Sequence, residues 1–196
     1  MDYYLNEENC YNRLLAEYEK YGTIIVAVDF DGTINDFHNE GLEFDNMISL
    51  LKKCNEIGFR LVIYTANDNY YEIYKRCDDM GIKIEGINKQ LLPQFEGRGK
   101  LYYNILIDDR SGMVTSYNLL KRIINHIQQL EKLSKFIHEE CWINFAQGIY
   151  KEEVNLSQKR KSRWSNLFVP YEDLPESEKE KDRVFARKLM GFLQND

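Results

Sequence analysis

The sequence has few of the residues that build disulfide frameworks, zinc sites or membrane spans. Its 196 residues include four cysteines, three histidines, three prolines and two tryptophans. No two cysteines lie within four residues of each other, which excludes a C-x-x-C zinc or redox motif and predicts reduced thiols. The longest clean apolar run, residues 24–28, is far too short for a membrane span, and the first residues lack the pattern of a secretory signal. We therefore predict a cytoplasmic protein without a membrane partner.

An excess of positive charge is also lacking. The chain carries 26 Lys and Arg against 32 Asp and Glu, a net charge of −6, which argues against a general nucleic-acid or membrane-surface binder. The acidic surplus is uneven, because residues 1–112 have 12 basic and 20 acidic side chains, whereas residues 113–196 have 14 and 12. With 43% hydrophobic and 30% charged residues, the chain is typical of one globular domain, or of one domain and a small module.

Residues 1–112 alternate between strand and helix patterns. Helical spacing of apolar residues precedes Gly22 and recurs over residues 44–57 and 69–80. This alternation predicts an α/β fold with a Rossmann-like parallel sheet, helices on both faces, and a ligand site beyond the carboxyl ends of the strands. The strands are expected where apolar, β-branched residues run continuously, at residues 23–28, 59–64, 82–87 and 103–107.

The pattern changes after Gly112. Residues 114–139 are expected to form one long helix, whose apolar residues follow a spacing close to a heptad seam. Such a helix either packs on its own domain or pairs two copies of the chain as a homodimer. We predict three parts: a domain over residues 1–112, a connecting helix over residues 113–139, and a small, mostly helical module over residues 140–196. That module contains both tryptophans and the basic run at residues 159–163, and Ser177 and Glu180 have capping-box spacing before a last helix.

Acidic and hydroxyl side chains follow three of the predicted strands. Asp29 and Asp31 follow the first strand, Thr65 follows the second, and Asp108 and Asp109 follow the last. If these strands are neighbours in a parallel sheet, four carboxylates converge at one edge, and such a concentration of like charge needs a cation or a proton. Oxygen ligands without His or Cys suit a hard cation, and Mg²⁺ is the first choice.

Two carboxylates at positions i and i+2 of a turn can point into the same cavity with different environments. One can act as a nucleophile and the other as a proton donor. Gly32, which follows Asp31 and precedes Thr33, lets the backbone bend sharply. A positive side chain is still needed to balance the charge of a phosphate. Lys100, just ahead of the last strand, is the natural candidate, and Lys89 is the alternative.

The segment Val26-Ala27-Val28-Asp29-Phe30-Asp31-Gly32-Thr33 resembles the first motif of the haloacid-dehalogenase-like (HAD) phosphohydrolase superfamily. Tyr64-Thr65 is similar to the second motif, and Leu106-Ile107-Asp108-Asp109-Arg110 is similar to the fourth. The resemblance covers roughly residues 20–112. It implies a Rossmann-like domain in which Asp29 forms an aspartyl-phosphate and Asp31 protonates the leaving group and then activates water.

The same resemblance implies the remaining site residues. Thr65 and Lys100 would bind the transferring phosphoryl group. Mg²⁺ would be held by Asp29, the backbone carbonyl of Asp31, Asp108 and Asp109. Positions beside these motifs, and the alternative lysine, are expected to contact substrate: Gly32, Thr33, Ala66, Asn67 and Lys89.

The spacing of the motifs leaves no room for the cap domain that many members of this superfamily insert. An enzyme without a cap has an open site. We expect a phosphatase that acts on a nucleotide or another small phosphate ester. The alternatives are a phosphatase for the 3′ or 5′ end of a nucleic acid, aided by the patch at residues 160–164, and a non-catalytic scaffold that presents the C-terminal module.

The C-terminal region carries a second resemblance. Residues 170–183, with the pattern P-Y-x-x-L-P-x-x-E-K-x-x-D-R and Trp142 upstream, are similar to the ryanodine-receptor-type repeat domain. This resemblance covers roughly residues 140–193 and implies recognition, not catalysis. The basic run beside Trp164 has two interpretations, a surface that binds phosphates and stacks a base or a solvated loop beside a tryptophan of a small core.

Overall fold

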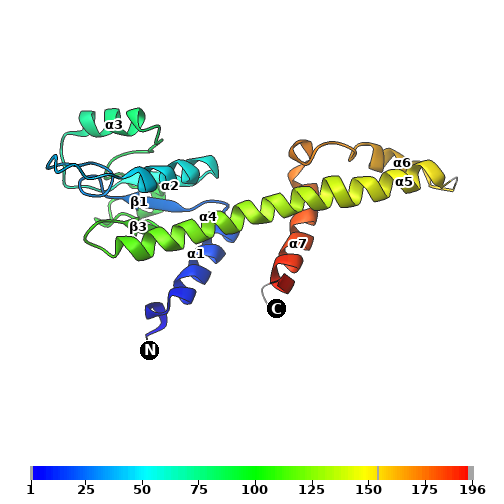
Figure 1. Cartoon of the computed structure of the whole chain (residues 1–196), viewed down its shortest axis with the longest axis horizontal. Coiled ribbons are helices and arrows are strands. Elements are labelled where there is room, and N and C mark those ends of the chain that lie inside the picture. The colour runs from blue at the N-terminus through cyan, green and yellow to red at the C-terminus, as the bar shows by residue number, and fades with distance from the viewer. Residues whose placement is uncertain (1, 154, 194–196) are drawn as a thin grey trace. The chain divides into compact units, whose positions relative to one another are not determined.

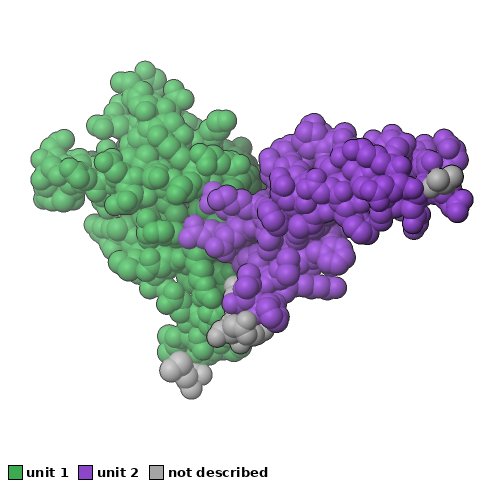
Figure 2. Space-filling model, turned by 45° about the vertical axis from the view of Figure 1, so that its right-hand side comes forward, with its two compact units in different colours: residues 1–124 green, residues 125–196 purple. Residues whose placement is uncertain are grey.

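The computed structural model of the chain describes residues 2–153 and 155–193 and divides into two compact units (Figure 2). Unit 1 covers residues 1–124 and unit 2 covers residues 125–196. The division falls inside helix α4 (Met113–Phe136). In the described part of the chain, no helix is both long enough and apolar enough to cross a membrane.

Unit 1 is built on a three-stranded parallel sheet. The strand order is β2-β1-β3, and Val28 at the end of β1 is level with Ile63 of β2 and Ile107 of β3. All four residues of β1 are buried, as expected for a central strand that is covered on both faces. The strands are β1 (Ile25–Val28), β2 (Arg60–Ile63) and β3 (Ile105–Ile107).

Helices cover the sheet on both sides. Figure 1 shows α2 and α3 on one side of the strands, with α1 and the first part of α4 on the other. This arrangement confirms the predicted α/β fold with a parallel sheet between helices. The helices of unit 1 are η1 (Tyr3–Leu5), α1 (Glu7–Tyr21), α2 (Asp45–Glu56), α3 (Tyr70–Asp79), the short η2 (Pro93–Phe95) and the first part of α4.

Local sequence explains where the first helix begins and ends. The side chain of Asn6 accepts a hydrogen bond from the backbone N–H of Glu8 and caps the N-terminus of α1. Gly22 ends the helix in the left-handed conformation, with a φ of 69°. On the buried side of α4, Leu120 and Ile123 are fully buried within the chain, so this part of the predicted heptad seam packs on its own domain.

The strand predicted over residues 82–87 is wrong. Only Ile87 forms a bridge, a parallel one with Ile63, although the N–H of Glu85 also donates to the carbonyl of Leu61 at 2.8 Å. The backbone leaves the extended conformation directly afterwards, because Asn88 has a φ of 49°. The segment therefore borders β2 without becoming a regular strand.

Unit 2 is helical. The helix predicted to end at residue 139 continues without a break, from α4 through the π-helix η3 (Ile137–Ile143) into α5 (Asn144–Glu152). The basic run at residues 159–163, for which a loop was one interpretation, lies in a helix. The other elements of unit 2 are α6 (Gln158–Ser165), η4 (Tyr171–Asp173) and α7 (Glu176–Leu193). Because α7 begins at Glu176, Ser177 lies inside its first turn, and the predicted capping box does not mark the helix start.

A polar network fastens the last elements of unit 2 to α4. Arg183 of α7 donates to Glu131 of α4 at 2.6 Å and also pairs with Glu176. The hydroxyl of Tyr171 donates to the same Glu131 at 3.0 Å, and burial together with that carboxylate raises the pKa of Tyr171 to about 12. Only 16% of the Arg183 side chain is exposed, so its loss would leave the half-buried Glu131 with the hydroxyl of Tyr171 but without this cation.

Candidate functional site

The predicted acidic residues meet at the carboxyl end of the sheet, at the topological switch point beside the central strand β1. The chain leaves β1 for β2 on one side, whereas β3 pairs with the other side of β1, which creates a crevice at the carboxyl ends. Asp29 and Asp108 come directly after β1 and β3, and the N–H of Asp29 still donates to the carbonyl of Ile107 at 2.8 Å. On the other side, the N–H of Tyr64 donates to the carbonyl of Val28, which brings Thr65 to the same edge.

A cavity of about 650 Å³ lies at this edge. Its lining joins the three strand ends, and it includes eight of the predicted site residues: Asp29, Asp31, Gly32, Thr65, Ala66, Asn67, Asp108 and Asp109. Side chains that lie far apart in the sequence therefore form one site.

Asp29 is a half-buried carboxylate whose pKa lies clearly above the ordinary aspartate value. Burial raises its pKa to about 6, a shift that the N–H of Phe30 opposes and the charges of Asp108, Asp109 and Asp31 increase. Asp29 therefore keeps its proton to a higher pH than an ordinary aspartate, and once it is ionised its negative charge is poorly stabilised unless a cation lies beside it. The chemistry of the cavity thus creates a need for positive charge.

Asp31 is held by two amide side chains. Asn67 donates to one of its carboxyl oxygens at 2.8 Å, and Asn35 donates to the other at 2.8 Å. These bonds hold the Asp31 carboxyl in the same cavity as Asp29. Asn67 was among the predicted site residues, whereas Asn35 was not, although its position four residues after Asp31 was the available sign.

The turn after Asp31 depends on Gly32 and Thr33. Gly32 has a φ of 78°, and a Cβ there would lie 3.2 Å from the Oδ2 atom of Asp109, so no larger residue fits without displacing that carboxylate. Thr33 is fully buried and does not line the cavity. Its hydroxyl accepts from the N–H of Asp109 at 3.2 Å and donates to Asp29 at 3.5 Å, so it links two acids where a substrate contact was expected.

Thr65 is positioned by Asn88, a residue that the sequence analysis did not single out. The backbone N–H of Thr65 donates to the Asn88 side chain at 3.0 Å, and that side chain donates back to the Thr65 carbonyl at 2.7 Å. The hydroxyl of Thr65 accepts from the N–H of Asn67 at 3.1 Å. Asn88 lines the cavity, whereas Lys89, the residue after it, does not.

Neither predicted lysine lines the cavity. Lys89 is exposed and lies near Glu85, and Lys100 is exposed in the loop ahead of β3, where its carbonyl accepts from Gln90. Arg110 lines the cavity instead, 3.9 Å from Asp109 and with 92% of its side chain exposed. A guanidinium with this freedom can reach an anion bound above the carboxylates.

The cavity offers carboxylate oxygens, the donor atoms that suit a hard cation. In residues 2–153 and 155–193, no three His, Cys, Asp or Glu side chains already form a metal site. Mg²⁺ does not need three such side chains, because it keeps several waters and is usually bound by one or two carboxylates and by substrate phosphate oxygens. Asp29 and Asp108, from adjacent strand ends, fit that requirement.

Aromatic side chains form part of the cavity rim. Phe37 and Tyr64 line the cavity with 58% and 43% of their surface exposed, and the ring of His38 packs edge-on against Phe37 with centroids 5.1 Å apart. The loop that carries Phe37 is held by Asp36, whose carboxylate accepts hydrogen bonds from backbone N–H groups further along the loop. The rim therefore offers flat apolar surfaces next to an acidic floor.

No protein-family model matches the chain, and no curated protein matches it. Among solved structures, the chain is similar to a conserved protein from Bacteroides thetaiotaomicron. The two are 25% identical, with a TM-score of 0.44, and the similarity covers 54% of this chain and 92% of that one.

Proposed function

We propose that unit 1 is a Mg²⁺-dependent phosphatase of the HAD-like type, without a cap domain, which hydrolyses a nucleotide or another small phosphate ester. One observation carries the proposal: four carboxylates from the ends of β1 and β3 share a cavity with Thr65 from the end of β2. A structural role does not account for this concentration of like charge, whereas a bound cation and a phosphoryl group do.

The proposed reaction begins with attack by a carboxyl oxygen of Asp29 on phosphorus. The bond from phosphorus to the leaving oxygen breaks, and Asp31 gives that oxygen a proton, which leaves an aspartyl-phosphate on Asp29. Asp31 then removes a proton from water, which attacks phosphorus and releases phosphate from Asp29. The amides of Asn35 and Asn67 hold Asp31 for both steps.

Asp29, the backbone carbonyl of Asp31, and Asp108 with Asp109 would hold Mg²⁺. When bound, the ion would offset the charge of the carboxylates and of the phosphate, and so keep Asp29 ionised. Thr65 and Arg110 line the cavity and would contact the phosphoryl oxygens. In this role Arg110 takes the place that the sequence assigned to Lys100.

The rim favours a substrate with a flat ring. Phe37 and Tyr64 can stack on a base while its phosphate reaches the carboxylates below, which supports a mononucleotide among small phosphate esters.

The test is a measurement of phosphate release with and without Mg²⁺ from p-nitrophenyl phosphate, mononucleotides and oligonucleotides phosphorylated at either end. Asp29→Asn is the inactive control, and Asp79→Asn, an exposed acid at the end of α3, is the matched control. The proposal predicts release from a small ester that needs Mg²⁺ and Asp29. Release only from oligonucleotides, lost at raised salt, would assign the site to nucleic-acid ends. No release from any substrate would support a non-catalytic scaffold.

A further inference from the structure

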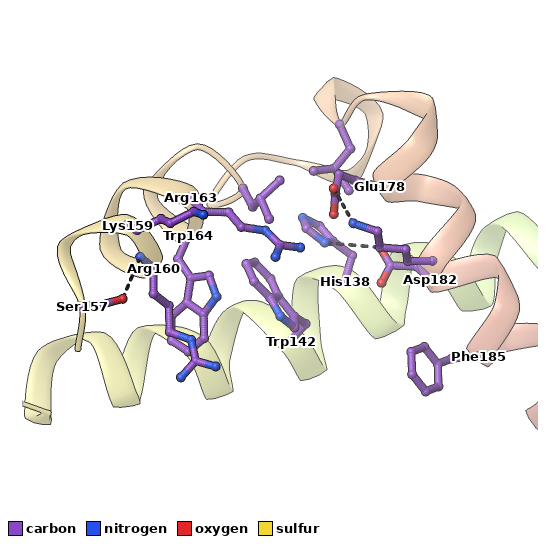
Figure 3. A pocket seen from close by; sticks show the side chains of 13 residues that line it. His138, Trp142, Ser157, Lys159, Arg160, Arg163, Trp164, Glu178, Asp182 and Phe185 are labelled. Atoms are coloured by element: carbon purple, nitrogen blue, oxygen red, sulfur yellow. Dashed lines mark hydrogen bonds and ion pairs between the residues drawn. The ribbon is translucent and has the colours of Figure 1, made fainter. Parts of the chain in front are cut away.

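Unit 2 contains a cavity of its own, of about 420 Å³, between η3, α6 and α7 (Figure 3). Trp142 of η3 and Trp164 of α6 both line it, and they are the two tryptophans of the chain. The volume lies in the range of small-molecule sites, and the walls combine aromatic and charged side chains as such sites do. Every lining residue belongs to unit 2, so the cavity does not depend on unit 1.

One wall of this cavity is formed by a π-helix. π-Helical segments are rare in proteins, and those that do occur are often found at functional sites. In η3 the rings of His138 and Trp142 are stacked, with centroids 5.5 Å apart and an angle of 13° between their planes. His138 is held in place because its Nε2 atom lies 2.9 Å from the carbonyl of Val169 and its Nδ1 atom lies 3.4 Å from Asp182. The wall is therefore a fixed aromatic surface that faces the cavity.

The opposite wall carries positive charge without a matching negative charge. Lys159, Arg160 and Arg163 of α6 line the cavity, and no carboxylate in the described part of the chain forms an ion pair with them. The two acids of the cavity are already paired, Glu178 with Lys181 and Asp182 with His138. In Figure 3, Arg163 extends from α6 toward Trp142 and His138. The cavity as a whole therefore has an unbalanced positive charge beside its aromatic wall.

Trp164 contacts both the basic wall and the aromatic wall of the cavity. The guanidinium of Arg160 lies 5.5 Å from its ring, and its ring meets that of Trp142 edge-on, with centroids 6.3 Å apart. A ligand with a flat ring can pack against these indoles, while its negative group reaches the cations of α6, which form no ion pair with a carboxylate in the described part of the chain.

We propose that this cavity binds a small phosphate-bearing molecule with a planar ring, of the size of a mononucleotide. The phosphate contacts Arg163 and the cations at the start of α6, and the ring packs on Trp142 and Trp164. This site is distinct from the carboxylate cavity of unit 1, and the proposal rests on unit 2 alone.

A polynucleotide fits these observations less well. Proteins that bind nucleic acid through its backbone commonly neutralise many phosphates along an extended track. Here the unpaired cations occupy one wall of a single cavity on a helix of eight residues. One or two phosphate groups are sufficient to balance them.

The tryptophans provide a direct measurement, because both lie in this cavity and unit 1 has none. We would titrate AMP, GMP, UMP and inorganic phosphate into the full chain with Asp29→Asn, without divalent cation, and excite where tyrosine does not absorb. A mononucleotide is expected to quench the fluorescence to saturation. Arg163→Ala should weaken binding about tenfold or more, since it removes a charge-assisted contact.

Lys161→Ala is the matched control, because Lys161 belongs to the same basic run but does not line the cavity. It should change the affinity less than about twofold, in line with a surface charge. Trp164→Phe keeps a ring, leaves Trp142 as the reporter, and should weaken nucleotides more than phosphate. Circular dichroism establishes that each variant is folded.

Three results would overturn the proposal. The first is no saturable quenching by any mononucleotide, or quenching that Arg163→Ala and Lys161→Ala reduce equally. The second is inorganic phosphate binding as tightly as AMP, which would make the cavity a plain anion site. The third is a phosphorylated oligonucleotide binding far more tightly than any mononucleotide, which would assign the surface to nucleic acid.

Discussion

The two cavities of this chain are lined by charges of opposite sign. In unit 1, carboxylates from adjacent strand ends lie together, and burial raises the pKa of Asp29 to about 6. In unit 2, Lys159, Arg160 and Arg163 share a cavity with two tryptophans and lack carboxylate partners in the described part of the chain. Each cavity therefore has a charge that its own residues do not balance, and that charge indicates a ligand of opposite sign. The acidic cavity suits a cation and the basic cavity an anion.

The largest expected effect is a loss of catalytic rate at Asp31, which would distinguish the acidic cavity, as a catalytic site, from the basic cavity, as a binding site. Asp31→Asn should lower kcat/KM for a mononucleotide by about 10²–10⁴, because the leaving oxygen loses its proton donor. The loss should be smaller for p-nitrophenyl phosphate, whose leaving group needs no proton. Asp79→Asn should leave both rates unchanged. Equal losses for the two substrates would argue against a general acid at position 31.

The second prediction concerns what holds unit 2 together. Arg183→Met should lower the free energy of unfolding by about 2–4 kcal/mol, since the half-buried carboxylate of Glu131 would keep Tyr171 but lose the cation that balances its charge. Arg187→Met, on the same helix, removes an ion pair with Glu180 at a more exposed position and should cost less than about 1 kcal/mol. Urea unfolding followed by tryptophan fluorescence measures both variants in unit 2. A similar loss for the two would show that the network around Glu131 has no special weight.

The third prediction uses the pKa of Asp29. The pKa of Asp29 in the folded chain, about 6, exceeds the ordinary aspartate value of 3.8, so the unfolded chain loses this proton first, and stability falls as the pH rises from about 4 to about 6. Asp29→Asn removes that loss, and at pH near 7 without divalent cation it should raise the free energy of unfolding by about 1–2 kcal/mol, after allowance for partial exposure. This gain in the free energy of unfolding should vanish at a pH below about 4 and should be smaller when Mg²⁺ is present. A destabilised variant at neutral pH would contradict the burial of an uncompensated charge.

The smallest expected effect concerns the rim of the acidic cavity. Phe37→Ala should raise KM for a mononucleotide by about threefold to tenfold, because a base loses a stacking surface. The KM for inorganic pyrophosphate or glycerol phosphate, which have no ring, should hardly change. Tyr71→Ala, an exposed ring on α3 outside the cavity, is the matched control. Equal changes for ringed and ringless substrates would assign Phe37 to the shape of the loop.

The sequence predicted the acidic cavity far better than the basic one. A carboxylate directly after a buried parallel strand must lie at the sheet edge, so Asp29, Asp31 and Asp108 were placed by the strand pattern alone. The supporting amides Asn35 and Asn88 were missed because loop conformation decides their partners. Lys100 was chosen for its position along the chain, but the loop ahead of β3 keeps it off the cavity.

The basic cavity needs the packing of three helices that are distant in sequence. A π-helix has no sequence pattern comparable to that of a buried strand, so the stacking of His138 on Trp142 in η3 was not predictable. The basic run at residues 159–163 was noted, but only its helical form brings Arg160 and Arg163 onto one cavity while Lys161 stays outside it.

The most direct test of the proposed catalysis is to trap the phosphorylated enzyme. In Asp31→Asn with Mg²⁺ and p-nitrophenyl phosphate, the first step needs no acid, but hydrolysis of the aspartyl-phosphate lacks its base. We predict a burst of one nitrophenolate per chain and, after acid quenching, a phosphoryl group on the peptide that contains Asp29. Nitrophenolate and phosphate released in step, with no phosphorylated peptide and with the same rate in Asp29→Asn, would contradict the account.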